Sequence, residues 1–227
     1  MKTAICFSGL PRFIKEGHKM FSKNLIGFEE MDIFFHTWSN PSKGNSEQLS
    51  RKDSIEEIHN LYNVVDYIEE SQLHDIAPSG ISHEEFIHWS MFYSIWSANN
   101  LKKQYETKNG MEYDCVIRTR FDCALLDPLN VMEHINDFNF VCTPWIHKHG
   151  VIMDWLNFSS SKIMDTHSEV WKNMGSYKNQ GVQMNSGEEL LTNHLKTNNI
   201  GFKSVDVDVK LIRIGDGAKT WINVKQL

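Results

Sequence analysis

Two arginines and one aspartate stand at alternate positions near the middle of the chain: Arg118, Arg120 and Asp122. They end the segment 113–122, whose β-branched and aromatic residues predict a strand buried on both faces. Side chains alternate along a strand, so this spacing predicts that all three share one face at the strand's carboxyl end. Open α/β sheets bind ligands there. Buried charges need partners, which leaves two interpretations: an internal Arg–Asp salt bridge, or an anion site with an attached metal ligand.

The second interpretation has a definite chemistry. The carboxylate of Asp122 is a ligand that Mg²⁺ or Mn²⁺ prefers. The planar guanidinium of Arg118 or Arg120 can hold a phosphate through two hydrogen bonds. The two roles together suit a diphosphate.

A second candidate segment follows the first predicted strand. Ser8 and Gly9 form a turn before a helix, and glycine would let backbone amides approach a phosphate or a base. Arg12 stands at the start of that helix. The Gly-Lys-Ser/Thr ending of a P-loop is absent, so a plain turn is the alternative. Trp38 ends the second predicted strand and could stack on a nucleobase or sugar, or simply pack in the core.

Two carboxylates in the second half of the chain are candidates for acid–base chemistry. Asp154 lies in an apolar stretch, where an unpaired carboxylate is unfavourable. Glu188 and Glu189 open a helix, where the helix dipole alone favours acidic residues. His147 and His149 show no third ligand in the sequence, which favours surface histidines over a metal site.

The elements that position these residues alternate along the chain. Hydrophobic patterns predict strands at 3–8, 31–37, 64–68, 113–122, 138–142, 202–209 and 210–214, and helices at 13–28, 82–107, 161–173 and 187–197. Ser54 with Glu57 and Ser82 with Glu85 have the spacing of capping boxes. The alternation predicts an α/β fold, Rossmann-like, with a mainly parallel central sheet flanked by helices. Two polar segments, 38–53 and 172–187, are predicted as loops, and at least one of them is expected to become ordered when a ligand binds.

Length and composition favour a single domain over 1–227. The net charge of −6 argues against non-specific nucleic-acid binding. The four cysteines lack CxxC spacing and are typical of small buried residues in a reducing compartment. The apolar run at 4–7 is too short for a signal sequence, and no run reaches the roughly 20 residues that span a bilayer. A cytoplasmic location is therefore expected.

The order of several motifs resembles a known family. Tyr93-Ser94, Ala98-Asn99 and Tyr105-Glu106 precede Ile117-Arg118-Thr119-Arg120-Phe121-Asp122, and the segments 5–12, 32–38, 150–154 and 188–191 continue the pattern. This order resembles the small nucleotide-sugar glycosyltransferases of GT-A fold from bacterial lipopolysaccharide and viral glycan loci. The resemblance implies one GT-A-like domain, with a donor half at 1–122 and an acceptor half at 123–227.

The same resemblance implies the ligands. The donor would be a nucleotide-diphosphate sugar bound by Ser8, Gly9, Arg12, Trp38, Arg118, Arg120 and Asp122, with Mn²⁺ or Mg²⁺ on Asp122. Asp154 or Glu188 would act on a glycan or lipid-linked acceptor, and the latter leaves peripheral membrane association open. The chain departs from the family's Asp-x-Asp pattern, because Arg120 occupies the first Asp position.

Two alternatives come from other classes. A non-catalytic sugar- or nucleotide-binding module would keep the fold and is favoured by the missing Asp. A sulfotransferase-like enzyme is suggested by Ser-Gly-Leu-Pro-Arg, although that turn lacks the expected Lys or Thr pattern.

Overall fold

The structure is a computed structural model that describes residues 2–39, 55–72, 77–137, 139–214 and 221–227. Its centre is a seven-stranded sheet in the order β3-β2-β1-β4-β7-β6-β8. The strands are β1 (Thr3–Ser8), β2 (Asp32–Trp38), β3 (Val64–Glu70), β4 (Cys115–Thr119), β6 (Phe140–Thr143), β7 (Asn157–Ser159) and β8 (Gly201–Ser204). Only β7 runs antiparallel to its neighbours β4 and β6; the other pairs are parallel. The predicted α/β class with a mainly parallel central sheet is confirmed.

A second, three-stranded sheet has the order β10-β9-β5. It joins β5 (Cys123–Leu125) to β9 (Val209–Arg213) and β10 (Trp221–Asn223). Because β5 begins directly after the turn that follows β4, this sheet brings β9 close to the carboxyl end of β4. The hydrophobic patterns of the sequence did not predict β5, β7 or β10.

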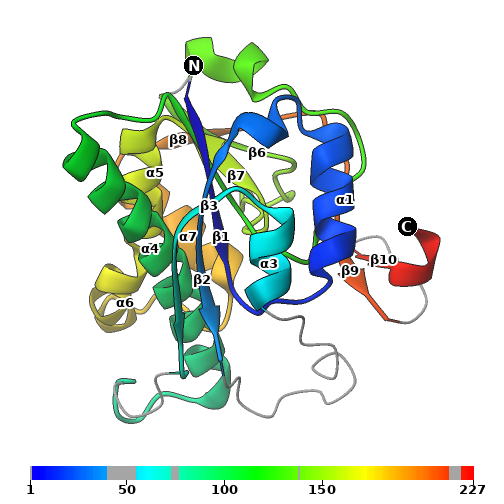
Figure 1. Cartoon of the computed structure of the whole chain (residues 1–227). Helices are drawn as coiled ribbons and strands as arrows, with labels where there is room; N and C mark the ends of the chain where they lie inside the picture. The colour runs from blue at the N-terminus through cyan, green and yellow to red at the C-terminus, as the bar shows by residue number, and fades with distance from the viewer. Residues whose placement is uncertain (1, 40–54, 73–76, 138, 215–220) are drawn as a thin grey trace.

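Helices cover both faces of the central sheet (Figure 1). α1 (Ile14–Asn24) and α3 (Ile55–Leu61) pack on the face that presents Phe7 and Phe35. α4 (His83–Asn109) and α5 (Ser161–Ser168) cover the opposite face, while α6 (Val170–Asn179) and α7 (Gly187–Thr197) pack beyond them. Short 3₁₀ helices occupy Phe28–Glu30, Val131–Asp137 and Val224–Gln226.

The long helix α4 begins as its sequence predicts. Ser82 Oγ accepts a hydrogen bond from Glu85 N, and Glu85 Oε2 accepts one from Ser82 N, which completes the capping box. The helix ends at Gly110, whose φ of 58° is in the left-handed region that favours glycine. In the second predicted capping box, formed by Ser54 and Glu57, Ser54 lies outside the described residues.

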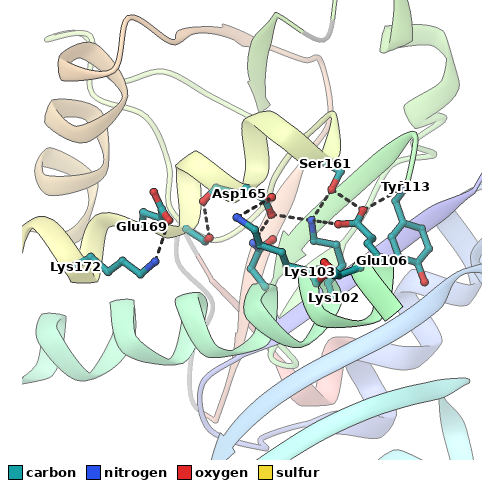
Figure 2. Close-up of polar contacts among 11 residues, drawn as sticks. Lys102, Lys103, Glu106, Tyr113, Ser161, Asp165, Glu169 and Lys172 are labelled. Atoms are coloured by element: carbon teal, nitrogen blue, oxygen red, sulfur yellow. Dashed lines mark hydrogen bonds and ion pairs between the residues drawn. The ribbon is translucent and has the colours of Figure 1, made fainter. Parts of the chain in front are cut away.

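A buried ionic network fastens α4 to α5 and to the segment before β4 (Figure 2). Lys102 Nζ donates to Asp165 Oδ1 at 2.7 Å and to Glu106 Oε2 at 2.9 Å. It also donates to Ser161 Oγ. Glu106 Oε1 in turn accepts from Tyr113 N at 2.9 Å and from Ser161 Oγ at 2.7 Å. The Lys102 side chain is fully buried.

Several element boundaries differ from the predicted ones. The helix predicted over 161–173 is divided at Glu169 into α5 and α6. The helix predicted over 13–28 ends at Asn24, because Leu25 bridges to Leu129 and Gly27 adopts a φ of 78°. The strand predicted over 113–122 stops at Thr119, so Arg120 and Asp122 lie in a turn and not on the strand. The strand predicted over 202–209 covers only Gly201–Ser204 in β8.

The loop predicted over 172–187 is wrong for its first half. Residues up to Asn179 belong to α6, because Val170, Met174 and Tyr177 recur at helical spacing and are buried against α7 and α4. Of the other predicted loop, 38–53, residues 40–53 lie outside the described part of the chain.

All four cysteines are buried and free, as predicted. Each lies in a strand: Cys6 in β1, Cys115 in β4, Cys123 in β5 and Cys142 in β6.

The close contact between α1 and the turn after β4 gives a test of the fold. A Cβ at Gly17 would lie 2.0 Å from the backbone oxygen of Phe121, between Arg120 and Asp122. Gly17→Ala should therefore lower the free energy of unfolding by about 1–3 kcal/mol in urea titrations. Gly175→Ala is the control, because a Cβ there meets nothing within 4 Å and should stabilise α6 by about 0.5–1 kcal/mol. Equal effects of the two changes would contradict the tight contact.

Candidate functional site

The strand order identifies where a ligand would bind. From β1 the chain moves outward through β2 to β3, then returns to place β4 on the other side of β1. The order therefore reverses between β1 and β4, and open α/β sheets bind ligands outside the carboxyl ends of such a pair. The register pairs Cys6 with Arg118 and Phe7 with Thr119. Ser8 and Gly9 therefore lie beside the turn that contains Arg120.

Ser8 and Arg118 are buried at this point with hydrogen-bonding capacity to spare. Each is 3% exposed. Their side chains share the α4 face, since Cys6 and Val116, two positions before each, pack in the same cluster with α4. Within the described part of the chain, Ser8 Oγ and both Nε and Nη1 of Arg118 have no hydrogen-bond partner. Burial lowers the pKa of Arg118 to about 10, against the opposing effect of Asp154, so it is charged at neutral pH. An anionic ligand would supply the missing partners.

The Gly9 turn is held by α4. Gly9 has a φ of 105°, and its amide donates to Ser94 Oγ at 2.9 Å and to the His36 oxygen at 3.3 Å. The amide is therefore already bonded within the protein. The expected approach of a phosphate to Gly9 therefore depends on the open space beside this residue and not on its amide. A Cβ at Gly9 would meet nothing within 4 Å.

Behind this turn, Ser94, His36 and Glu70 stand in a row. His36 Nδ1 lies 2.8 Å from Ser94 Oγ, and His36 Nε2 lies 2.9 Å from Glu70 Oε1. The residue types match a hydrolase triad, but the two ring nitrogens are interchanged, because in such a triad Nε2 faces the serine and Nδ1 the carboxylate. Ser94 also lies in mid-helix, and its hydroxyl already accepts from the Gly9 amide. The row joins β1, β2, β3 and α4, and it positions the turn.

Trp38 lies in an aromatic cluster. It is buried, contacts His36 edge-on at 4.6 Å between ring centroids, and stacks on Tyr93 at 5.6 Å. Trp38 therefore packs in the core, which is one of the two roles that the sequence allowed; the other was stacking on a nucleobase or sugar.

Asp122 forms a salt bridge, one of the two interpretations that the sequence left open, and it contacts two arginines. Arg120 donates from Nε to Oδ1 at 2.7 Å and from Nη2 to Oδ2 at 2.9 Å. Arg213, at the end of β9, donates from Nη1 to Oδ2 at 2.6 Å. Burial alone would raise the pKa of Asp122, but the two guanidiniums outweigh it and hold the pKa below its ordinary value.

Arg12 belongs to the same group. Its pKa is lowered by burial and by the charges of Arg120 and Arg213, and raised by Asp122. We call Arg12, Arg120 and Arg213 around Asp122 the arginine cluster. It holds three positive charges against one negative charge, in a protein whose net charge is −6. This local excess of positive charge suits an anionic ligand.

The residues around Asp122 do not fit a divalent cation. Both carboxylate oxygens already accept arginine N–H groups, and a metal ion there would stand among three guanidiniums. Across the residues that the structure describes, no three His, Cys, Asp or Glu side chains are grouped to hold a metal. His147 Nε2 instead lies 3.7 Å from Glu188 Oε1.

Asp154 and Glu188 lie close to each other at the start of α7. A Cβ at Gly187 would stand 2.9 Å from Asp154 Oδ2 and 2.8 Å from Met91 Cε, so the absence of a side chain lets α7 approach Asp154. Burial and the charge of Asp154 raise the pKa of Glu188, against the effect of His147. A carboxylate with a raised pKa is suited to take a proton near neutral pH.

Asp154 also connects the two groups of residues. Its charge acts on Arg118 and Arg120 as well as on Glu188 and the His88 ring. The structure thus brings Arg118, Arg120, Asp122, Asp154 and Glu188 into one electrostatic neighbourhood at the β1–β4 edge.

Two cavities open beside the amino-terminal half of α4. One of about 370 Å³ is lined by Glu84, Glu85 and the segment 182–185. One turn after Glu84, burial lowers the pKa of His88, against the charges of Asp154 and Glu84. A more apolar cavity of about 500 Å³ lies against Trp89 and Trp171.

Sequence reasoning missed Arg213 and His88. Arg213 reaches Asp122 across 91 residues through the β5–β9 pairing, and no local pattern marks it. His88 lies in the apolar pattern of α4, where a helical wheel gives no sign that Asp154 is near.

Comparison with known proteins adds no relative: no protein-family model and no curated protein matches this sequence. Among the helices of the described ranges, none has both the length and the apolar character needed to cross a membrane.

Proposed function

We propose that the protein is a glycosyltransferase that moves a sugar from a nucleotide-diphosphate sugar to a hydroxyl acceptor. The observation that carries the proposal is the buried pair Ser8 and Arg118, which directs unpartnered polar groups to the β1–β4 edge. A bound diphosphate would supply partners for these groups. The positively charged arginine cluster and the carboxylate pair beside it provide the other two things that glycosyl transfer requires.

Each group has a role in this reaction. The bond between the sugar's anomeric carbon and the diphosphate oxygen breaks, and the negative charge that grows on the leaving group faces Arg118 and the arginine cluster. The acceptor oxygen forms a bond to the anomeric carbon and gives its proton to Glu188. Asp154 balances the charge of Arg118 and keeps the pKa of Glu188 raised. The site lies where 1–122 meets 123–227, which supports a single GT-A-like domain with a donor half and an acceptor half.

A binding module of the same fold is the second candidate. Its support is specific: Asp122 is fully engaged by arginines, in place of the expected Asp-x-Asp site. Hydrolysis or transfer of a nucleotide-diphosphate sugar, followed by release of the nucleoside diphosphate, decides for the enzyme.

The binding role of Ser8 can be tested apart from its structural role. Ser8→Ala removes a hydroxyl that has no partner in the described protein, so the melting temperature without ligand should stay equal or rise. Its affinity for a nucleoside diphosphate should fall about three- to tenfold, the loss of one hydrogen bond. Isothermal titration and thermal shift measure the two effects.

Ser94→Ala is the matched control for Ser8→Ala. It removes a hydroxyl that the Gly9 amide and His36 both contact, so it should lower the melting temperature. If Ser8→Ala instead destabilises the free protein and leaves affinity unchanged, the β1–β4 edge is not the ligand site.

A further inference from the structure

We propose that the arginine cluster, and not a divalent cation, neutralises the leaving diphosphate of this protein. The inference rests on the proposed function, and it departs from the Mn²⁺ or Mg²⁺ that the sequence resemblance implies. Its basis is the geometry of Arg120 and Arg213, whose guanidiniums both donate to the carboxylate of Asp122; the charge of Arg12 acts on the same group.

The arginine cluster carries more positive charge than Asp122 balances. Asp122 neutralises one of the three guanidiniums, which leaves an excess of positive charge of the kind that a metal ion usually supplies. Arg120 and Arg213 are 27% and 14% exposed in their side chains, whereas Asp122 is 3% exposed. The carboxylate is therefore enclosed, while the side chains of Arg120 and Arg213 are partly exposed.

Arg120 and Arg213 use only some of their N–H donors on the described protein. Arg120 commits Nε and one Nη2 hydrogen to Asp122, and Arg213 commits Nη1 to Asp122 and to the Ile212 oxygen. A guanidinium has five N–H groups in a fixed plane, so among the described residues both side chains keep further donors for phosphate oxygens. Asp122 fixes the orientation of the two planes, which makes it a positioning residue and not a metal ligand.

The surroundings of Asp122 are unfavourable for a divalent ion. A divalent ion at Asp122 would have to displace arginine hydrogen bonds at 2.6–2.9 Å. It would also be repelled by three like charges. A diphosphate meets the opposite situation, because the three positive charges of the arginine cluster attract it.

Inorganic pyrophosphate is the probe that isolates this charge. Titrated calorimetrically into the full-length protein in EDTA, it should bind. Excess Mn²⁺, which converts the free anion into its metal complex, should not strengthen binding. Binding that appears only with Mn²⁺, or no binding under either condition, would overturn the inference.

Two substitutions sharpen the test. Under the metal interpretation, Asp122→Asn abolishes binding; under ours, the guanidiniums that hold the anion remain, so pyrophosphate should still bind in EDTA, and a complete loss of binding would contradict the inference. Arg213→Gln should weaken binding about tenfold or more. Lys210→Gln is the matched control, since it removes a positive charge from the same strand, where Lys210 faces Asp208 at 3.8 Å; it should change affinity less than about twofold.

Folding and function remain separable. If Arg213→Gln melts far below the parent, Arg213→Lys keeps the charge, loses the planar fork, and should weaken binding by an intermediate factor; unchanged affinity in Arg213→Lys would then contradict the inference. If pyrophosphate binds in EDTA but no nucleotide-diphosphate sugar binds, the proposed function fails while the anion site stands. If nucleotide sugars bind only with Mn²⁺, the function stands and the metal-free inference fails.

Discussion

Glu188→Gln should lower kcat for sugar transfer by about 10²–10⁴-fold and leave the affinity for nucleoside diphosphate within about twofold. Glutamine keeps the shape of the side chain but cannot take the acceptor's proton. Donor binding depends on Arg118 and the arginine cluster, which this change leaves intact. Single-turnover rates with saturating nucleotide sugar, compared with calorimetric titration of the diphosphate, measure the two effects separately.

Glu189→Gln is the control for this prediction. It changes the neighbouring residue in the same first turn of α7, where Glu189 is exposed and its backbone N–H bonds to Ser186 Oγ. Its kcat should stay within about twofold of the parent. If both variants lose activity equally, the effect comes from the helix terminus and not from Glu188 as a base.

The pH profile carries further information on the same carboxylate. Glu188 must be ionised to accept a proton, so kcat should rise as the pH passes through its pKa, which lies above the ordinary value of 4.5. Asp154→Asn removes a negative neighbour that raises this pKa, so the acid limb of the profile should move to lower pH. A limb that stays in place would show that Asp154 does not act on Glu188.

Lys102→Met should lower the free energy of unfolding by about 3–5 kcal/mol, the usual loss when one partner of a buried ion pair is removed. The change leaves Glu106 and Asp165 without the ammonium that both contact. Urea titration at pH 7 measures the loss. Burial alone would lower the pKa of Lys102, but Asp165 and Glu106 outweigh it and raise the pKa above 10.5. The stabilisation is therefore fully present below about that pH and is lost only as the pH rises through the raised pKa.

Lys103→Met is the matched control for Lys102→Met. Lys103 is the next residue of α4 and lies 3.5 Å from the other oxygen of Asp165, but its side chain is 54% exposed. Exposed pairs contribute about 0–1 kcal/mol. Adding Asp165→Asn to Lys102→Met should recover part of the loss, because it removes one uncompensated charge. Equal losses for Lys102→Met and Lys103→Met would mean that the network in Figure 2 is not buried in solution.

Local sequence patterns predicted the elements whose limits depend on neighbouring residues alone. The Ser82–Glu85 box predicted the start of α4, and the apolar runs predicted β1, β2 and β3 to within two residues. They failed where a distant partner decides. β4 stops at Thr119 because the chain turns to pair β5 with β9, and α6 was hidden because its buried residues stand between Lys, Asn, Gly and Ser.

The same distinction applies to the candidate site. One of its features followed from the sequence, a carboxylate at the start of α7. The ion pair of Arg120 with Asp122 was one of two interpretations that the sequence left open. The contact of Arg213 with Asp122 did not follow from the sequence, because Arg213 comes from a separate sheet. The alternating spacing of Arg118, Arg120 and Asp122 also misled, since it holds only while the strand continues.

The pairing of β5 with β9 has a consequence for the folding pathway. Residues 123–125 pair with 209–211, a contact between segments that are far apart in the sequence. The entropic cost of closing this long loop is offset only when the intervening helices have packed. The central parallel strands β1, β2 and β3 can assemble without it. Binding competence should then be acquired late in refolding, because Arg213 reaches Asp122 only when β9 docks. A ligand at this edge would stabilise the finished protein without accelerating its early collapse.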